Sequence, residues 1–268
     1  MRQWDYRKLL IKSLSLDILK NHPATVLFIW VTVGFVASSQ LLYTAFLFHG
    51  SFALVDLHLS QNRALLFDAL LSILFFLQHS ILIRKSVKTK LSRFVPNEYY
   101  GSFYGITTAL VLFPVVLFWQ KSSIVIGTAE GVSFWLLRAA FALSLLLFVW
   151  GVKSLGRYDA SGVEPLLDAI NNTQNEPYPF MVRGAYRWVR HPLYLCTFIF
   201  MWSCPILTLD RLLLNTLWSV YTVFGAILEE RDLVKTFGRS YLQYKSQVPM
   251  LLPYRIPNNK IAQSRSIL

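Results

Sequence analysis

Six long apolar runs dominate the pattern of hydrophobic and polar positions along the chain. They cover residues 24–47, 64–83, 103–119, 132–151, 192–209 and 212–228, and each contains few charged residues. About 20 residues of α-helix cross the hydrocarbon core of a bilayer, and none of the runs shows the alternation of a transmembrane β-barrel strand. The pattern therefore predicts an all-α, polytopic transmembrane helical bundle of about six spans.

The polar segments between these runs predict the domain organisation. We expect a single integral membrane domain, residues 1–268, with the first four spans in residues 1–151, a cytoplasmic loop in residues 152–191, and a cofactor-binding helical hairpin and tail in residues 192–268. The tail is expected to begin with a polar cytoplasmic helix from about residue 229 to residue 245. Residues 4–19 combine apolar and basic positions, which is typical of a helix on the membrane surface, and residues 171–177 read as an irregular loop.

Composition and charge support a membrane protein. Only 15% of the residues are charged, whereas a soluble domain carries about 25%. The net charge is +12, and with six spans all of the 26 Lys and Arg residues lie on one side except Arg63, Lys121, Arg138 and Arg211. Because basic residues stay in cytoplasmic loops, both termini are expected to be cytoplasmic, in the inner membrane if the source is bacterial. Topology thus explains the basicity, and no separate basic patch predicts nucleic-acid binding.

Two polar clusters bracket the last predicted hairpin, at residues 184–194 and 229–249. The 37 residues between His191 and Glu229 fit two antiparallel spans with a brief turn. The hairpin should therefore return Glu229 to the membrane face that the chain left at His191, so we expect the two clusters to meet in space.

The residue types in these clusters suit a ligand that carries both charges. Pro192 is typical of a first helical turn, and a helix N-terminus, strengthened by Arg187 and Arg190, favours a carboxylate or a phosphate. Glu229 and Glu230 lie close to lipid depth, which is costly unless a cation is near. An amino-acid moiety fits such a pocket. A structural alternative is that the arginines anchor the span at lipid phosphates and pair with the glutamates.

The spacing of these residues resembles a known family. The run Tyr186-Arg187-x-x-Arg190-His191-Pro192-x-Tyr194, then Glu229-Glu230, then Phe237-Gly238-x-x-Tyr241-x-x-Tyr244-x-x-x-Val248-Pro249, is similar to the isoprenylcysteine carboxyl methyltransferase superfamily of integral membrane methyltransferases. The resemblance implies S-adenosyl-L-methionine as the cofactor. It implies cofactor contacts from Tyr186, Arg187, His191, Pro192, Tyr194, Glu229 and Glu230, and catalytic roles for Arg190, His191 and Glu230.

The first half of the chain narrows the resemblance to one branch. Phe76-Leu77-Gln78-His79-Ser80 and Arg93-Phe94-Val95-Pro96 are similar to the methanethiol S-methyltransferase and nurim-like branch. The sequence departs from the superfamily at Ala185, where proline is frequent, and at Cys196, where glycine or alanine is usual. The branch implies S-methylation of a small thiol such as methanethiol.

Two further polar residues are candidates for substrate contact. His79 lies within the second predicted span, where an ionisable side chain indicates a functional site or, alternatively, an interhelical hydrogen bond. Asp159 resembles a polar element of the same branch, and a surface turn is the alternative interpretation. Two cysteines without further ligands, Cys196 and Cys204, predict no metal site.

Three functions stay open at this point. The favoured one is an S-adenosylmethionine-dependent membrane methyltransferase acting on a small-molecule or lipid-soluble thiol. The second is carboxyl methylation of an isoprenylcysteine or another lipid-borne acceptor, and the third is a non-enzymatic, nurim-like membrane scaffold. The chain has no Gly-x-Gly-x-x-Gly motif, so the usual soluble methyltransferase fold is not expected.

Overall fold

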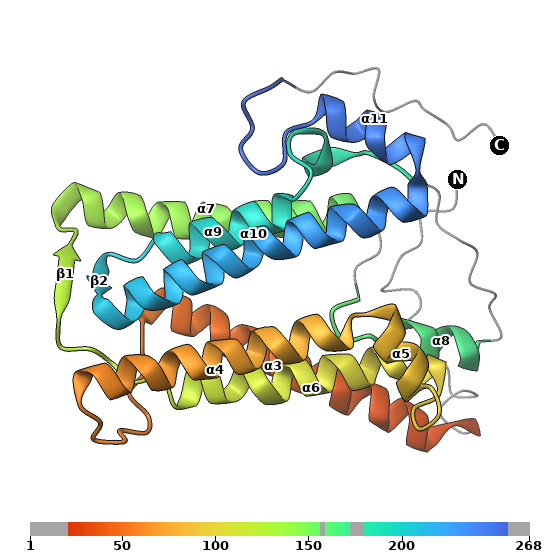
Figure 1. Ribbon diagram of the computed structural model, residues 1–268, viewed down its shortest axis with the longest axis horizontal. Helices are drawn as coiled ribbons and strands as arrows, with labels where there is room; N and C mark the ends of the chain where they lie inside the picture. Colours follow the sequence, from red (N-terminus) through yellow and green to blue (C-terminus); the bar gives the residue numbers. More distant parts are fainter. Residues whose placement is uncertain (1–20, 156–158, 172–179, 257–268) are drawn as a thin grey trace. The chain divides into compact units, whose positions relative to one another are not determined.

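Helices dominate the described part of the chain. The computed structural model describes residues 21–155, 159–171 and 180–256. The expected surface helix over residues 4–19 lies outside them, as does nearly all of the expected loop over residues 171–177. Five helices within these described ranges are long and apolar enough to cross a membrane: α3 (Pro23–His49), α4 (Gln61–Leu82), α6 (Asn97–Leu117), α7 (Gly131–Leu155) and α10 (Leu209–Phe237) (Figure 1). The predicted all-α polytopic bundle is confirmed, while the cytoplasmic location of the termini stays a prediction.

Shorter elements connect these helices. They are α5 (Lys85–Leu91), β1 (Val125–Thr128), α8 (Glu164–Ile170), η1 (Gly184–Arg187), α9 (Pro192–Trp202), β2 (Ile206–Thr208) and α11 (Arg239–Gln247). The described residues pack as two compact units: the first contains residues 21–121 and 159–171, and the second residues 122–155 and 180–256. These units describe packing alone, and a single integral membrane domain stays a prediction.

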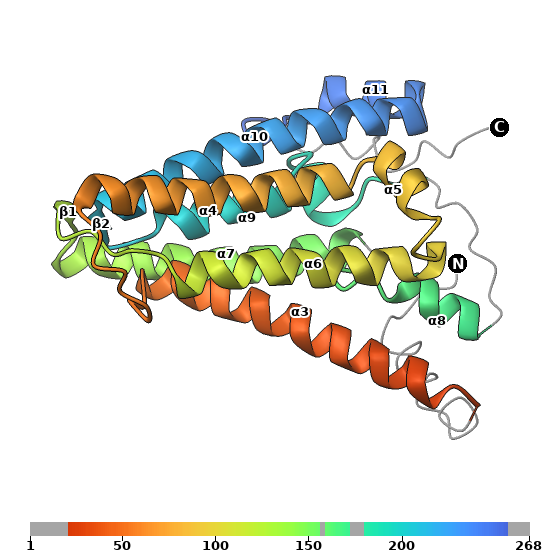
Figure 2. The ribbon, with the colours of Figure 1, turned by 60° about the horizontal axis from the view of Figure 1, so that its bottom comes forward.

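The first unit is organised around α6, which lies between α3 and α4 (Figure 2) and also packs against α8. Gly101 on α6 touches the loop before α8 at Gly162, and a Cβ at either position would collide with the other backbone. Gly162 has a φ of +67°, a conformation that glycine adopts without steric cost. This close contact fixes the start of α8 against α6. Val163 and Leu167 are then buried against Ile29 of α3.

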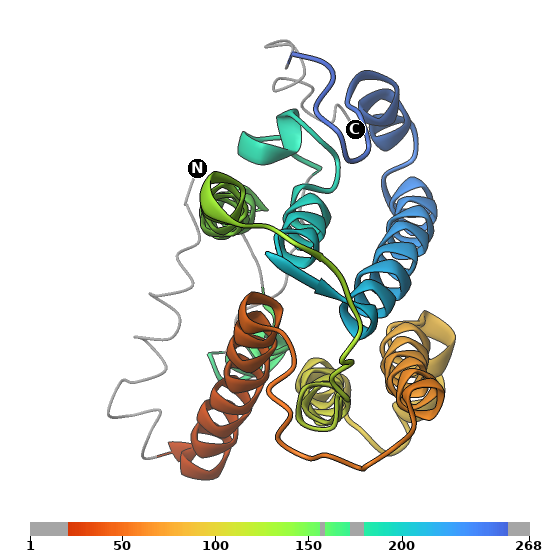
Figure 3. The same cartoon turned by 90° about the vertical axis from the view of Figure 1, so that its left-hand side faces the viewer.

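In the second unit, α9 lies between α7 and α10 (Figure 3). The strands β1 and β2 pair in antiparallel fashion, so α7 and α10 both begin beside this short ladder. Gly151 of α7 allows close approach of Leu193, because an added Cβ would lie 2.7 Å from the Leu193 Cδ2 atom. The start of α9 is thereby held at the C-terminal end of α7.

The fifth predicted span, residues 192–209, is not one helix. Helix α9 ends at Trp202 and residues 203–208 continue as non-helical backbone. The reason is Pro205, which lacks an amide N–H and disfavours helical geometry in Cys204. Eleven helical residues rise about 16 Å, which is about half of the roughly 30 Å that α10 rises from Leu209 to Glu230. The non-helical segment 203–208 supplies the rest of this crossing.

The predicted separate polar helix over residues 229–245 is also wrong in its boundaries. Helix α10 runs without interruption through Glu229 and Glu230 to Phe237. The break comes at Gly238, which has a φ of +54°, and the tail helix α11 begins at Arg239. Both glutamates are therefore held on a continuous helix.

Candidate active site

The start of α9 and the last turns of α10 bring His191 and the glutamate pair together, as predicted. His191 immediately precedes Pro192, the first residue of α9, and its side chain is buried. Its Nδ1 atom lies 3.7 Å from Oε2 of Glu229, and its Nε2 atom lies 3.3 Å from Oε1 of Glu230. The imidazole ring is thus placed between two carboxylates.

Glu230 is the buried member of the pair. Its side chain is 5% exposed, and Arg190, which is 8% exposed, donates from Nε to Oε1 over 2.6 Å. The second oxygen, Oε2, lies 2.8 Å from the Nζ atom of Lys245 on α11. Two cations therefore compensate a carboxylate that would otherwise be expensive to bury.

Glu229 is the accessible member of the pair. Its side chain is 48% exposed, and its Oε2 atom accepts a hydrogen bond of 2.9 Å from the Tyr194 hydroxyl. The Tyr194 ring in turn stacks on the His191 ring, with centroids 5.3 Å apart and an interplanar angle of 4°. One turn of α9 thus presents a stacked pair of rings beside a solvent-accessible carboxylate.

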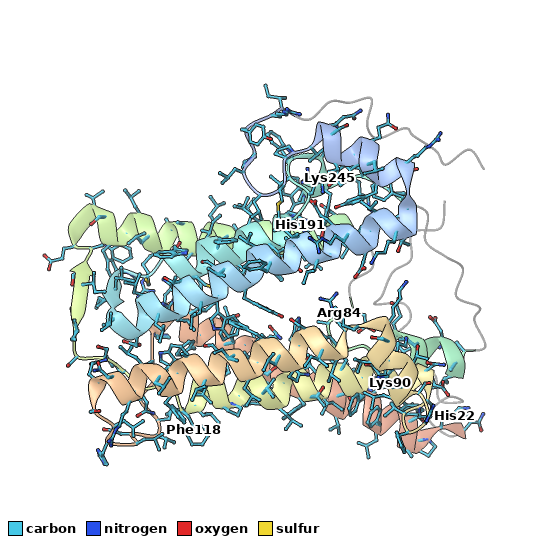
Figure 4. The ribbon with its side chains drawn as sticks, viewed as in Figure 1. His22, Arg84, Lys90, Phe118, His191 and Lys245 are labelled. Carbon is cyan, nitrogen blue, oxygen red and sulfur yellow. The ribbon has the colours of Figure 1, made fainter. Side chains whose placement is uncertain are left out.

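The tail forms one wall of the site, and Figure 4 shows Lys245 on α11 close to His191. The backbone N–H groups of Arg190 and His191 donate to the carbonyl oxygens of Pro249 (2.9 Å) and Met250 (3.1 Å). Arg190 also donates from Nη1 to the carbonyl oxygens of Lys245, over 2.9 Å, and of Val248. The segment from Lys245 to Met250 is therefore fastened to the start of α9.

Residues 184–188 bring further predicted site residues to the same region. Gly184 has a φ of +53°, and a Cβ there would collide with the side chain of Ser154, whose Oγ accepts a hydrogen bond of 3.0 Å from the N–H of Ala185. This packing fixes η1, which contains Tyr186 and Arg187. The carbonyl oxygen of Tyr186 accepts a hydrogen bond of 2.7 Å from the Tyr244 hydroxyl.

Burial shapes the protonation of the site. Burial lowers the pKa of His191 and outweighs the opposing influence of the Glu229 and Glu230 charges. The ring is therefore neutral near pH 7 and carries one N–H group. Burial raises the pKa of the Tyr241 and Tyr244 hydroxyls, which keeps both protonated as hydrogen-bond donors.

The two candidate substrate residues belong to the first unit. The Tyr104 hydroxyl lies 2.9 Å from Nδ1 and 3.0 Å from Nε2 of His79, whose ring stacks on Phe75. The carboxylate of Asp159 accepts hydrogen bonds from the N–H groups of Gly162 (2.8 Å) and Glu164 (2.7 Å), and burial raises its pKa. These contacts support the alternative structural interpretations, an interhelical hydrogen bond for His79 and a turn for Asp159. The substrate roles of both residues stay predictions.

Metal ligation has no candidate among the described residues. Over residues 21–155, 159–171 and 180–256, no group of three or more His, Cys, Asp or Glu side chains is arranged to hold an ion. Cys196 and Cys204 are free thiols, and Cys196 is buried.

Sequence reasoning missed Lys245 and the pairing of residues 190–191 with residues 249–250. The similarity at Tyr244 and Val248 placed the tail in the motif, but Lys245 was one of seven basic residues between Arg231 and Arg265. Its position one residue after a motif tyrosine was the available signal.

Comparison with known proteins finds relatives over most of the chain. A methanethiol S-methyltransferase from Pseudomonas sp. is 35% identical over 195 residues, which cover 72% of this chain and 74% of the relative. Methanethiol S-methyltransferase 1 of Bradyrhizobium diazoefficiens is 32% identical over 200 residues, 73% of this chain and 69% of the relative. Nurim of Rattus norvegicus is 29% identical over 211 residues, 70% of this chain and 76% of the relative. No protein-family model and no solved structure matches the chain.

Proposed function

The chain belongs to the family of membrane methyltransferases that contains the methanethiol S-methyltransferases, and from this premise we propose that it methylates the sulfur of a small thiol such as methanethiol, with S-adenosylmethionine as the donor. The observation that carries the proposal is the cluster of His191, Tyr194 and Glu229 at the junction of α9 and α10. The five spans make the chain an integral, multi-pass membrane protein.

The side chains present fit the charges of this donor. S-adenosylmethionine carries an ammonium, a carboxylate and a sulfonium bearing an activated methyl group. The half-exposed carboxylate of Glu229 suits a cationic group, and the N-terminus of α9 suits a carboxylate. Arg187, on the neighbouring η1, is a second group for the carboxylate. We therefore assign the donor to the sequence-predicted residues around His191, Pro192 and Tyr194.

The chemistry asked of the protein is modest. The thiolate sulfur bonds to the methyl carbon as the carbon–sulfonium bond breaks, which yields dimethyl sulfide from methanethiol together with S-adenosylhomocysteine. The proton of the thiol is released to solvent, because the thiolate is the attacking form. Because the methyl group is already activated, alignment of the two partners and exclusion of water supply most of the rate.

The three residues predicted to be catalytic have different surroundings. His191 faces both carboxylates, so we assign it to the surface that contacts the donor. Arg190 and Glu230 neutralise each other in a buried pair, and we assign to them the task of keeping His191 in place. The sequence predicted catalytic roles for Arg190 and Glu230. We propose instead that both residues position His191.

An assay for methylation of methanethiol by the detergent-purified chain tests the proposal. We expect dimethyl sulfide from the unchanged chain, and a loss of about 10²-fold in His191→Ala and Glu230→Gln because alignment is lost. Equal activity in all three proteins would remove the site assignment. Absence of product together with absence of donor binding would remove the function.

The similarity to nurim supports a second candidate, a membrane protein of this fold without turnover. Binding of S-adenosylhomocysteine, measured by calorimetry, separates the two, since a non-enzymatic chain has no need of the site. A panel of acceptors distinguishes a third outcome: methylation of an isoprenylcysteine carboxylate leaves a methyl ester, whereas methylation of a thiol leaves a thioether.

A further inference from the structure

We propose that Lys245 is a positioning residue of this site: its ammonium group holds the buried Glu230 in place, so that Glu229 alone is the carboxylate that binds the cationic end of the methyl donor. The inference rests on the proposed function for the identity of the donor. Its geometry rests on the contacts of the second unit alone.

Both carboxylate oxygens of Glu230 are already engaged by neighbouring groups. Oε1 faces Arg190 at 2.6 Å and His191 at 3.3 Å, and Oε2 faces Lys245 at 2.8 Å. The side chain is 5% exposed. A ligand cation would have to displace one of these partners, and an unpaired buried charge is costly. Glu230 therefore supports the neighbouring residues of the site and does not bind the ligand cation.

Lys245 holds both members of the buried pair. Its ammonium lies against Glu230, while its backbone carbonyl accepts a hydrogen bond from Nη1 of Arg190. The position of the whole segment is fixed by the backbone bonds from residues 190 and 191 to Pro249 and Met250. Loss of the Lys245 ammonium would leave Oε2 of Glu230 without a cation and loosen Glu230, and with it His191, which Glu230 contacts through Oε1.

Glu229, unlike Glu230, has an exposed carboxylate that a ligand can reach. Half of its side chain is exposed, and its contacts are a hydrogen bond from the Tyr194 hydroxyl and the nearby ring of His191. No lysine or arginine among the described residues forms an ion pair with it. Its carboxylate is therefore available to an incoming ammonium or sulfonium.

The test measures dissociation constants of the full chain for S-adenosylmethionine and S-adenosylhomocysteine by calorimetry. We expect Lys245→Met to raise both dissociation constants about tenfold, because the buried carboxylate of Glu230 loses one of its two cationic partners. Lys245→Arg keeps the charge, so it should stay within about threefold of the unchanged chain. At saturating donor, Lys245→Met should recover most of kcat, so that the loss appears in KM.

Lys235→Met is the matched control. Lys235 is also a lysine at the C-terminal end of the second unit and also forms an ion pair, at 3.2 Å with Asp232, but both side chains are exposed. We expect unchanged dissociation constants, because exposed pairs contribute little. If Lys245→Met behaves like Lys235→Met, the inference is wrong. The inference is also wrong if Lys245→Met strengthens the binding of S-adenosylmethionine alone. That result would mean that the Lys245 ammonium acts only by repelling the cationic ligand and does not position Glu230.

A second variant tests the assignment of Glu229 without disturbing the buried pair. Glu229→Gln should weaken S-adenosylhomocysteine about tenfold yet leave 5′-methylthioadenosine unchanged, because that ligand lacks the amino-acid end. Equal weakening of both ligands, or of neither, would overturn the assignment. If the unchanged chain binds no donor at all, the proposed function fails; if it binds and methylates while these variants behave like it, this inference alone fails.

Discussion

At the scale of single residues, His191, Glu229 and Glu230 differ in burial and in the groups that contact them. His191 is buried and neutral, Glu230 is buried and paired with Arg190 and Lys245, and Glu229 is half exposed. Spacing in the sequence predicted that His191 would meet the glutamates, since a membrane hairpin returns the chain to its starting face. It did not predict which glutamate is buried, because that depends on the lysine supplied by the tail.

The lowered pKa of His191 makes stability depend on pH. In the unfolded chain a histidine titrates at about pH 6.5, and burial lowers the pKa of His191 in the folded protein. As the pH falls below about 6.5, the unfolded state takes up the proton first, so stability is present above this pH and declines toward acid. We expect the melting temperature to fall between about pH 7.5 and about pH 5.5, and to fall less in His191→Gln. Parallel pH curves for the two proteins would contradict this.

At the scale of elements, η1 depends on its own first residue, Gly184, which packs against α7. Gly184 has a positive φ and no room for a Cβ beside Ser154. We expect Gly184→Ala to lower the free energy of unfolding by about 2 kcal/mol and to weaken donor binding, because η1 shifts. Gly225→Ala is the control: Gly225 lies within α10 with nothing within 4 Å of its added Cβ, so no destabilisation is expected. Denaturation in detergent measures the stability of the two variants. Equal stability of Gly184→Ala and Gly225→Ala would refute the packing argument.

The tail helix is held by a hydrogen bond that a single substitution removes. The Tyr244 hydroxyl donates to the Tyr186 carbonyl oxygen. Tyr244→Phe should lower the free energy of unfolding by about 1 kcal/mol, because a partly buried carbonyl loses its donor. Tyr254→Phe, at an exposed position, should have no effect. A Tyr244→Phe chain as stable as the Tyr254→Phe chain would show that the bond contributes nothing.

Element boundaries were the part of the fold that hydropathy predicted least well. A drop in hydropathy at Glu229 marks the edge of the apolar layer, but Glu, Arg, Leu and Lys are all good helix formers, so α10 continues to Phe237. The true stop is Gly238. In the preceding crossing the apolar run continued past Trp202 while Pro205 ended the helix, so hydropathy overestimated that helix and underestimated the next.

At the scale of the whole molecule, charge predicts the membrane topology. With the α9–β2 segment counted as one crossing beside the five long helices of the described residues, we expect six crossings and both ends on the side of the basic loops. We expect a reporter that is active only in the cytoplasm to be active after residue 256 and inactive when inserted between Ser51 and Ser60. The opposite pattern would invert the orientation and place the candidate site outside.

The fastening of the tail to the start of α9 has a consequence for biosynthesis. Lys245, Pro249 and Met250 are translated after α10, the last span among the described residues, so a nascent chain can complete the insertion of these spans while the segment fastened to the start of α9 is still absent. If the proposed donor site is correct, we expect donor binding only after ribosomal elongation has passed these residues, and we expect a chain cut short before them to be inserted but inactive.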